Sequence, residues 1–516
     1  MASSPAAALL CASLLLSTAA KLTGDSRTAL QRAAELVQQG RLDEADQQAR
    51  LALSDPQTRA VACSVLGTIR FQQKRLKESA DFLQEAIRLE PRLVGARLSL
   101  AEVYTLQQKP ELAFGLFRQV LKLDPSNASA RLALARSEAE KGNYRQSLEF
   151  AKPALPALRQ SADGLLVLAT DYISLDDRVG TAGLASDWIK MENIAPAWSI
   201  RFALLLAKGG IVPEAIDVLE NAKHNQPVSY DLAFNLAGMY LLKNDTTHAL
   251  ENYDLAITRN PVSVAAFRQA ATVAEGHGEL ERALSYWMKA KKLEPENPEI
   301  LLGFGRVCLK MDLLDDAETA LTRAAGLRPD DPSYQYTLAS AKVGKKQFEV
   351  AQSILEGLIT KQPQDAHLHY ALGSVLYLEG HLNEAATHLR ESVRLQPDQQ
   401  AAYYYSALVA RDQGREAEAI RLLEELLRRY PDHALSCEVL GGMLMSAHRY
   451  SEAQKSLQKA ISLNPQSVKA NYQLGLLLAR MGEKDESDKQ LRLAHSLRVE
   501  DETNSRLQLR LLDPDR

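Results

Sequence analysis

The chain has 516 residues, of which 46% are hydrophobic and 24% charged, and its formal net charge is −4. This composition is typical of folded proteins, and the charge balance excludes a global attraction to nucleic acid or to an anionic membrane surface. The four cysteines, Cys11, Cys63, Cys308 and Cys437, lie far apart and form no C-x-x-C pair. This spacing argues against a disulfide framework or a zinc site, and we expect small buried hydrophobic side chains instead.

The N-terminus begins with an uncharged apolar stretch from Ala6 to Ala20. The stretch is too short to cross a bilayer comfortably but suits the core of a signal peptide. We therefore predict a signal peptide over residues 1–20, a short linker over residues 21–25 and an exported chain, periplasmic or secreted, with no membrane span after cleavage. The segment before Ala6 has no Lys or Arg, so an apolar start to a cytoplasmic chain is the alternative.

A regular period, marked by proline, then runs through the chain. Ten prolines are spaced by thirty-four positions or by three times that interval: Pro91, Pro125, Pro227, Pro261, Pro295, Pro329, Pro363, Pro397, Pro431 and Pro465. One phase divides residues 26–501 into fourteen repeats without insertion or deletion. With repeat positions numbered from 1 at Ser26, position 8 is always Ala or Gly, position 20 is Ala in ten repeats, and the prolines occupy position 32.

Each repeat predicts two amphipathic helices joined by turn residues. The small residues at positions 8 and 20 allow the two backbones to approach closely, while larger residues such as those at positions 7 and 24 fill the space around that contact. Proline at position 32 ends the second helix, because it has no N–H group and disfavours helix at the preceding residue. A single helix pair cannot bury its apolar face, so the pattern predicts a stacked solenoid.

The motif resembles the tetratricopeptide repeat (TPR) family, as in Leu66-Gly67 followed by Ala80 and Pro91. The resemblance covers about residues 26–501. Within the family, the chain resembles exported bacterial-type proteins that consist of a TPR array. The resemblance implies an all-α fold, a right-handed α-solenoid of about fourteen helix-turn-helix repeats. No separate catalytic domain is expected, because the repeats occupy almost the whole chain.

The repeats fall into three predicted groups: residues 26–127, the degenerate residues 128–195, and residues 196–501. In the middle group Pro153 and Pro156 interrupt a second helix, and position 32 lacks proline. We expect irregular packing there, with either a bend or an undisturbed superhelix. Residues 502–516 are predicted to form a capping helix or a tail.

The resemblance places positions 2, 5, 9, 12 and 13 of each first helix on the concave wall. In the run Tyr403-Tyr404-Tyr405, these rules place Tyr403 in the core, Tyr404 on the wall and Tyr405 near the seam with a neighbouring repeat. Tyrosine provides rigid amphipathic contact area, and arginine and lysine can pair with acidic groups. The predicted partner-binding residues are Tyr336, Tyr370, Tyr377, Tyr404, Tyr472, Arg306, Lys310 and Arg411. The alternative is that the tyrosines pack against the next repeat.

Motifs for phosphate binding, dinucleotide binding or nucleophilic catalysis do not occur in the sequence. The four histidines of one repeat, His367, His369, His381 and His388, are expected to diverge, so we predict no metal site and no cofactor. The sequence therefore favours a non-enzymatic scaffold that binds a peptide or a partner helix of another protein. The alternative is a regulatory or substrate-recruiting subunit of a separate enzyme, such as a glycosyltransferase or protease in an envelope or secretion assembly. Self-association through the solenoid ends is a third hypothesis.

Overall fold

The structure is a computed structural model that describes residues 25–501. The predicted signal peptide, the linker up to residue 24 and the segment 502–516 lie outside the described residues. Within residues 25–501 every regular element is helical. The chain divides into two compact units, an N-terminal unit that ends at Asn260 and a C-terminal unit that begins at Pro261.

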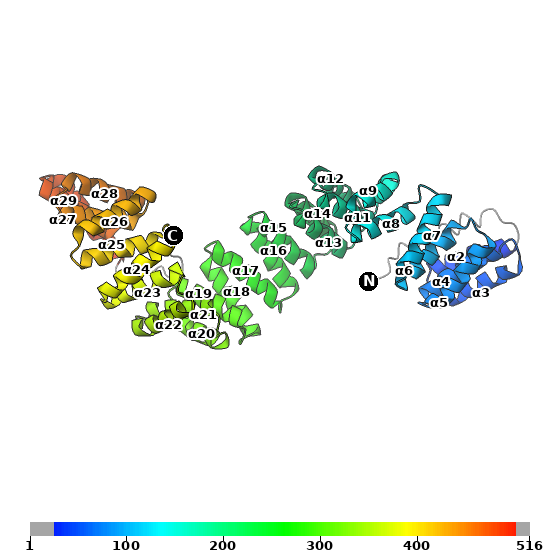
Figure 1. The fold of residues 1–516 in the computed structure, drawn as a ribbon, viewed down its shortest axis with the longest axis horizontal. Helices are drawn as coiled ribbons and strands as arrows, with labels where there is room; N and C mark the ends of the chain where they lie inside the picture. Colours follow the sequence, from blue (N-terminus) through cyan, green and yellow to red (C-terminus); the bar gives the residue numbers. More distant parts are fainter. Residues whose placement is uncertain (1–24, 502–516) are drawn as a thin grey trace. The chain divides into compact units, whose positions relative to one another are not determined.

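The N-terminal unit contains seven helix pairs, which appear in blue to green in Figure 1. Its first helices are α2 (Asp25–Gln38), α4 (Arg59–Gln72), α6 (Val94–Leu106), α8 (Ala128–Glu140), α11 (Ala162–Ser174), α13 (Pro196–Lys208) and α15 (Tyr230–Leu242). Its second helices are α3 (Leu42–Leu51), followed by the 3₁₀ turn η1 (Ala52–Ser54), then α5 (Leu76–Leu89), α7 (Pro110–Leu123), α9 (Tyr144–Ala151), α12 (Arg178–Ile189), α14 (Val212–Asn225) and α16 (Thr246–Arg259).

The C-terminal unit contains the other seven pairs, green to red in Figure 1. Its first helices are α17 (Val264–Gly276), α19 (Pro298–Lys310), α21 (Pro332–Gly344), α23 (Ala366–Glu379), α25 (Gln400–Asp412), α27 (Ala434–Ser446) and α29 (Val468–Met481). Its second helices are α18 (Leu280–Leu293), α20 (Leu314–Leu327), α22 (Phe348–Lys361), α24 (Leu382–Leu395), α26 (Glu416–Arg429), α28 (Tyr450–Leu463) and α30 (Lys484–Asp501). Each pair matches one predicted repeat, so the predicted all-α array of helix-turn-helix repeats is confirmed.

The turn inside each repeat has the same backbone conformation throughout. Position 15 has a positive φ in all fourteen repeats, for example 83° at Gly380 and 61° at Lys74. Half of these residues are glycine and half are not, although only glycine adopts this region without steric cost. The turn is stabilised by backbone hydrogen bonds across the helix end, as from Arg415 N to Ala410 O at 2.8 Å.

Proline and polar caps define the connection between repeats. The second helix α5 ends at Leu89, and Glu90 is extended, with φ −132° and ψ 92°, immediately before Pro91. This is the conformation that a following proline favours. The next first helices often begin after a capping side chain, such as Asp365, whose carboxylate accepts a hydrogen bond from the Leu368 backbone N–H at 3.2 Å.

The predicted irregular repeat is visible at residues 128–161. Its second helix is divided into α9, the 3₁₀ turn η2 (Lys152–Ala154) and the short helix α10 (Leu155–Leu158). Pro153 and Pro156 lie at the two interruptions, as expected from their missing N–H groups. The group boundaries at residues 127, 195 and 501 remain predictions.

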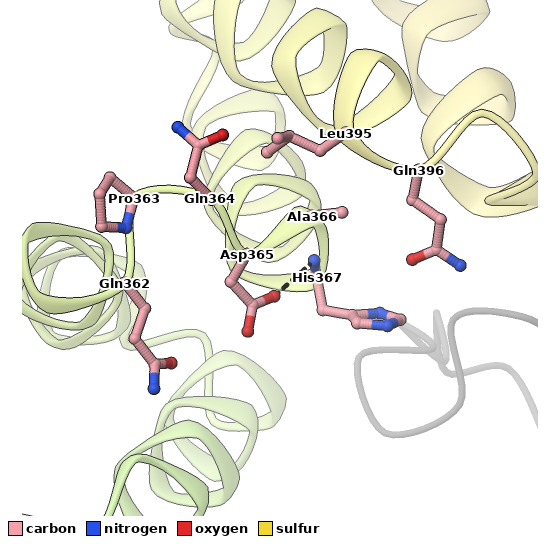
Figure 2. Close-up of a pocket in the computed structure, with 8 residues that line it drawn as sticks. All are labelled: Gln362, Pro363, Gln364, Asp365, Ala366, His367, Leu395 and Gln396. Carbon is pink, nitrogen blue, oxygen red and sulfur yellow. Dashed lines mark hydrogen bonds between the residues drawn. The ribbon is translucent and has the colours of Figure 1, made fainter.

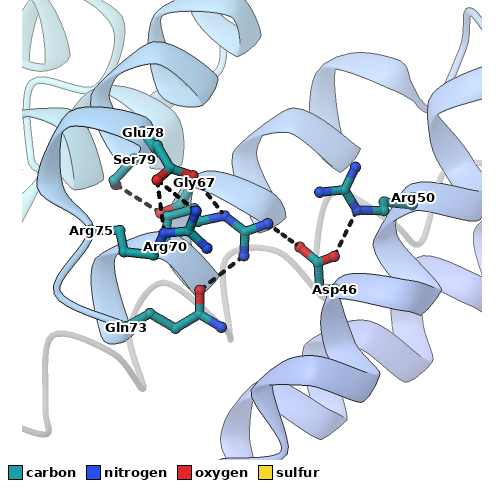
Figure 3. A network of polar contacts seen from close by, with 8 residues as sticks. All are labelled: Asp46, Arg50, Gly67, Arg70, Gln73, Arg75, Glu78 and Ser79. Atoms are coloured by element: carbon teal, nitrogen blue, oxygen red, sulfur yellow. Dashed lines mark hydrogen bonds and ion pairs between the residues drawn. The ribbon is translucent and has the colours of Figure 1, made fainter.

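The N-terminal unit also buries a cation between its first two repeats. The side chain of Arg70 on α4 is only 7% exposed, and its guanidinium binds Asp46 of α3 at 2.7 Å. The same guanidinium donates to Gln73 at 2.9 Å, and Asp46 also accepts from Arg50 at 2.6 Å (Figure 3). Pairing and hydrogen bonding offset the cost of burying this charge, so Arg70 links neighbouring repeats rather than offering a site.

Candidate partner-binding wall

The first helices of the C-terminal unit supply the candidate site. We call the first-helix wall the side chains at repeat positions 2, 5, 9, 12 and 13 of α17, α19, α21, α23, α25, α27 and α29. Successive first helices contact one another along this unit, as α17 with α19, α23 with α25, and α27 with α29. Side chains of neighbouring repeats therefore meet on the wall and contact one another.

The three consecutive tyrosines of α25 take three different environments. Tyr403 is buried, 8% exposed, with the Arg429 guanidinium 5.2 Å from its ring centroid. Tyr404 is half-buried on the wall, 5.6 Å from the His433 ring. Tyr405 packs edge-on against Tyr370 and Tyr377 of the preceding repeat, both at 5.9 Å. The predicted core position of Tyr403 and seam position of Tyr405 are confirmed.

The other predicted tyrosines differ in exposure. Tyr370 is fully buried at 0% exposure, in agreement with the packing alternative for this residue, whereas Tyr336 and Tyr377 are half-buried. Tyr472 is the most accessible, at 51%. Burial raises the pKa values of the Tyr336 and Tyr404 phenols, so both rings remain neutral at physiological pH.

The predicted cations Arg306 and Lys310 are engaged by the chain itself. The Arg306 guanidinium forms two 2.7 Å hydrogen bonds to the carboxylate of Glu275, and Lys310 Nζ lies 3.0 Å from the same group. The Glu275 side chain is only 5% exposed. Burial alone would raise the pKa of Glu275, but the two cations outweigh it and the pKa is lowered. We expected these cations to serve a partner's acidic groups; instead they neutralise a buried carboxylate.

Two further ion pairs follow the same spacing along the wall. Arg268 Nη1 lies 2.9 Å from Glu299, and Lys469 Nζ lies 3.1 Å from Glu438. The partners in both pairs are thirty-one positions apart in the sequence, as are Glu275 and Arg306. A separation of thirty-one positions is one 34-residue repeat minus about one helical turn. It therefore places the two partners side by side on adjacent first helices. This spacing is a sequence signal that the prediction of the site did not use.

The third predicted cation, Arg411, is paired within its own helix. Its Nε lies 2.7 Å from Asp412, whose other oxygen accepts a 2.8 Å hydrogen bond from the Tyr377 hydroxyl. Burial and this hydrogen bond raise the pKa of Tyr377 to about 12. Arg480, in the last repeat, is exposed and has no ion-pair partner among the described residues. The wall therefore presents tyrosine rings between charges that are almost all paired.

Two histidines expected to diverge instead meet between α23 and α24. His369 Nδ1 and His388 Nδ1 are 3.0 Å apart, and His369 Nε2 lies 3.1 Å from the Pro363 carbonyl oxygen. Because that carbonyl can only accept, His369 Nε2 donates to it, and in the neutral tautomer of His369 the Nδ1 atom accepts from His388 Nδ1. Burial and the neighbouring His369 lower the pKa of His388. The expectation of divergence was wrong for this pair, because the helix hairpin brings positions 4 and 23 together.

An open hollow of about 610 Å³ lies at the start of α23, and His367 is one of its lining residues (Figure 2). It is formed by two inter-repeat turns, with Gln362, Pro363, Asp365, His367, Leu395 and Gln396 among its lining residues. Asp365 caps α23 by accepting from the His367 backbone N–H at 2.8 Å. The carboxylate is thus used for folding, and the hollow concentrates no charge.

The described residues contain no group of three or more His, Cys, Asp or Glu side chains that could hold a metal ion. Cys63, Cys308 and Cys437 are free and buried, as predicted, and burial raises the pKa of the Cys308 thiol to about 11. No helix between residues 25 and 501 is long and apolar enough to cross a membrane.

The fold and the wall define a class of protein, an α-solenoid of paired helices whose first helices line one face. Two family models of the tetratricopeptide repeat match the chain, one over residues 105–169 and 274–341 and the other over residues 65–128, 336–390 and 379–434. A third model, of the TPR repeat, matches residues 441–482. Together these matches span more than half of the chain. The chain is therefore a tetratricopeptide repeat protein, a family whose members bind protein partners and generally act as non-enzymatic scaffolds.

Two curated proteins are distantly similar. The chain is 22% identical over 291 residues to the Protein CTR9 homolog of Arabidopsis thaliana, covering 54% of this chain and 26% of that protein. It is also 22% identical over 299 residues to the BBSome complex member BBS4 homolog of Drosophila melanogaster, covering 57% of this chain and 56% of that protein. The matches thus span about a quarter and about half of the length of these relatives.

Solved structures with a similar fold include the APC/C hetero-tetramer Cut9-Hcn1, with 14% identity, a TM-score of 0.41 and coverage of 90% of this chain and 98% of that chain. Yeast Tom70 has 16% identity, a TM-score of 0.38 and coverage of 93% and 97%. YrrB, a TPR protein with an unusual peptide-binding site, has 22% identity, a TM-score of 0.30 and coverage of 36% and 96%.

Proposed function

We propose that the protein is a non-enzymatic scaffold that binds an extended segment of another protein on the first-helix wall of the C-terminal unit. The observation that carries this proposal is the row of tyrosines at positions 5 and 12. Tyr377 and Tyr404 are half-buried and Tyr472 is exposed, so each presents ring surface while packing holds its backbone. Rigid aromatic rings of this kind supply contact area at low entropic cost.

Tyr404 is the centre of the proposed surface. Its ring contacts Tyr405 and His433, both with centroids at 5.6 Å, and Tyr405 in turn contacts Tyr377. The residues of this cluster lie on two successive first helices, α23 and α25, and on the turn before α27. A partner segment lying across it would therefore meet several repeats at once, which favours an extended segment over a compact contact.

Affinity capture followed by quantitative mass spectrometry tests this proposal. We expect a partner retained by the full chain to be lost by the double variant Tyr404→Ala/Tyr472→Ala. Tyr430→Ala is the matched control, because Tyr430 follows α26 outside the wall, where its hydroxyl bonds to the Asp398 carbonyl at 2.9 Å. Circular dichroism establishes that all three proteins are folded. Equal retention by both variants would contradict the proposal.

A regulatory or substrate-recruiting subunit of a separate enzyme is the second candidate function, because the same wall would serve either role. Capture of an enzyme by the wall in the same experiment would favour it.

We further propose export of the chain, on the basis of the apolar N-terminal stretch. Edman sequencing of the secreted protein tests this by showing cleavage near residue 20.

A further inference from the structure

We infer that the partner segment recognised by the first-helix wall is uncharged and is held by aromatic and apolar contacts rather than by ion pairs. This inference rests on the proposed function and specifies its ligand class. It follows from the charges of the wall, which, except for Arg480, are paired within the chain, most of them across repeat boundaries.

The pairing extends from one end of the C-terminal unit to the other. It includes Arg268 with Glu299 at 2.9 Å, Glu275 with Arg306 at 2.7 Å and Lys310 at 3.0 Å, Arg411 with Asp412 at 2.7 Å, and Glu438 with Lys469 at 3.1 Å. An acidic ligand would have to compete with these carboxylates for their cations. A basic ligand would meet carboxylates that already have cationic partners.

The two most buried carboxylates make this competition costly. The side chains of Glu275 and Glu438 are 5% and 11% exposed, and Glu438 also accepts a 2.6 Å hydrogen bond from Ser467. Withdrawing the cation from a buried carboxylate leaves an uncompensated charge, which is unfavourable. The surface left for recognition is the tyrosine rings, whose contacts with an uncharged segment require no such exchange.

Selection of a phage-displayed library of random twelve-residue peptides on the immobilised full chain tests the inference. We expect the enriched peptides that lose binding to Tyr404→Ala/Tyr472→Ala to contain fewer charged residues than the library. The dissociation constant of such a peptide should change less than about twofold between 50 and 500 mM NaCl, because screening acts on charge pairs and not on apolar contacts.

Glu275→Gln provides a test in the opposite direction. It removes the anion shared by Arg306 and Lys310, whose side chains are 37% and 29% exposed. We expect it to raise the affinity for peptides with Asp or Glu by about fivefold or more, as charge-assisted pairs form. Glu349→Gln, an equal charge change on the exposed face of α22, is the control and should leave the affinity unchanged.

Each outcome distinguishes the two claims. Tyrosine-dependent peptides rich in Asp and Glu, with binding that weakens tenfold at high salt, would overturn the inference and leave the proposed function standing. A selection that yields no tyrosine-dependent peptide would overturn the proposed function and the inference with it. If Glu275→Gln fails to fold, Glu299→Gln serves in its place, because the pair of Arg268 and Glu299 is 39% and 56% exposed.

Discussion

Asp171 on α11 is a buried carboxyl group with an incomplete set of hydrogen bonds. It is 0% exposed, it accepts a 2.5 Å hydrogen bond from the Ser147 hydroxyl, and its second oxygen has no hydrogen-bond partner among the described residues. Burial raises the pKa of Asp171 to about 7, although the serine lowers it in part. The folded protein therefore retains a proton that the unfolded chain releases near its ordinary pKa of 3.8.

Asp171→Asn should remove this proton linkage. Because the folded pKa is raised, the contribution of Asp171 to stability is present below pH 4 and is lost as the pH rises through about 7. We expect the variant to be more stable than the parent at pH 8, by about 2–4 kcal/mol, with little difference at pH 4. Urea unfolding at both pH values measures the effect, with the exposed Asp217→Asn as the control. A parallel pH dependence in parent and variant would contradict this assignment.

At the scale of the element, the contact between the two helices of a repeat depends on paired residue sizes. Where position 8 is glycine, position 24 is leucine, as in Gly67 with Leu83 and Gly441 with Leu457. A Cβ atom at Gly441 would lie 2.6 Å from Leu457 Cγ, and one at Gly67 would lie 2.6 Å from Leu83 Cγ. The glycine is therefore required by the close approach of the leucine.

Gly441→Ala should destabilise the C-terminal unit by about 1–3 kcal/mol, because the added methyl group displaces a packed leucine. The double variant Gly441→Ala/Leu457→Ala should lose less than the sum of the two single variants, since the clash is removed. Gly357→Ala is the control, and we expect it to change the free energy of unfolding in the opposite direction, because its Cβ would meet nothing within 4 Å. It should stabilise α22 by about 0.5–1 kcal/mol. Denaturant unfolding that shows additive losses would contradict the proposed coupling.

The helices themselves were predictable because their signals recur in every repeat. Proline at position 32 and small residues at position 8 act locally, so their effect does not depend on distant repeats. The positive φ at position 15 was not predicted, because residues such as Lys74 and His448 occupy it in half of the repeats. There the hydrogen bonds of the helix end hold a conformation that the side chain alone does not favour.

At the scale of the whole molecule, the site was predicted less completely than the fold. The sequence placed Tyr404 and Tyr472 on the wall but left open whether any tyrosine packs, and Tyr370 proved to be buried. The neutralisation of Arg306 by Glu275 depends on the register between adjacent repeats. The meeting of His369 with His388 depends on how one hairpin closes. Both are tertiary relationships that a position-by-position interpretation within one helix does not contain.

At the scale of the whole molecule, we assign partner recognition to one of the two units. The C-terminal unit carries the tyrosine-rich first-helix wall, while position 5 of the N-terminal repeats is mainly aliphatic, as at Leu98, Leu166 and Ile200. A partner that recognises aromatic rings should therefore contact the C-terminal unit. This assignment can be tested before the partner is identified.

The most direct measurement is site-specific photo-crosslinking in the cells that produce the protein. A benzophenone amino acid placed at position 404 keeps an aromatic ring on the wall, and one placed at the exposed position 421 of α26 samples the second helices. We predict a covalent adduct with a second protein from position 404 and none from position 421. An adduct from position 421 alone, or none from position 404 while the chain binds its partner, would contradict this prediction.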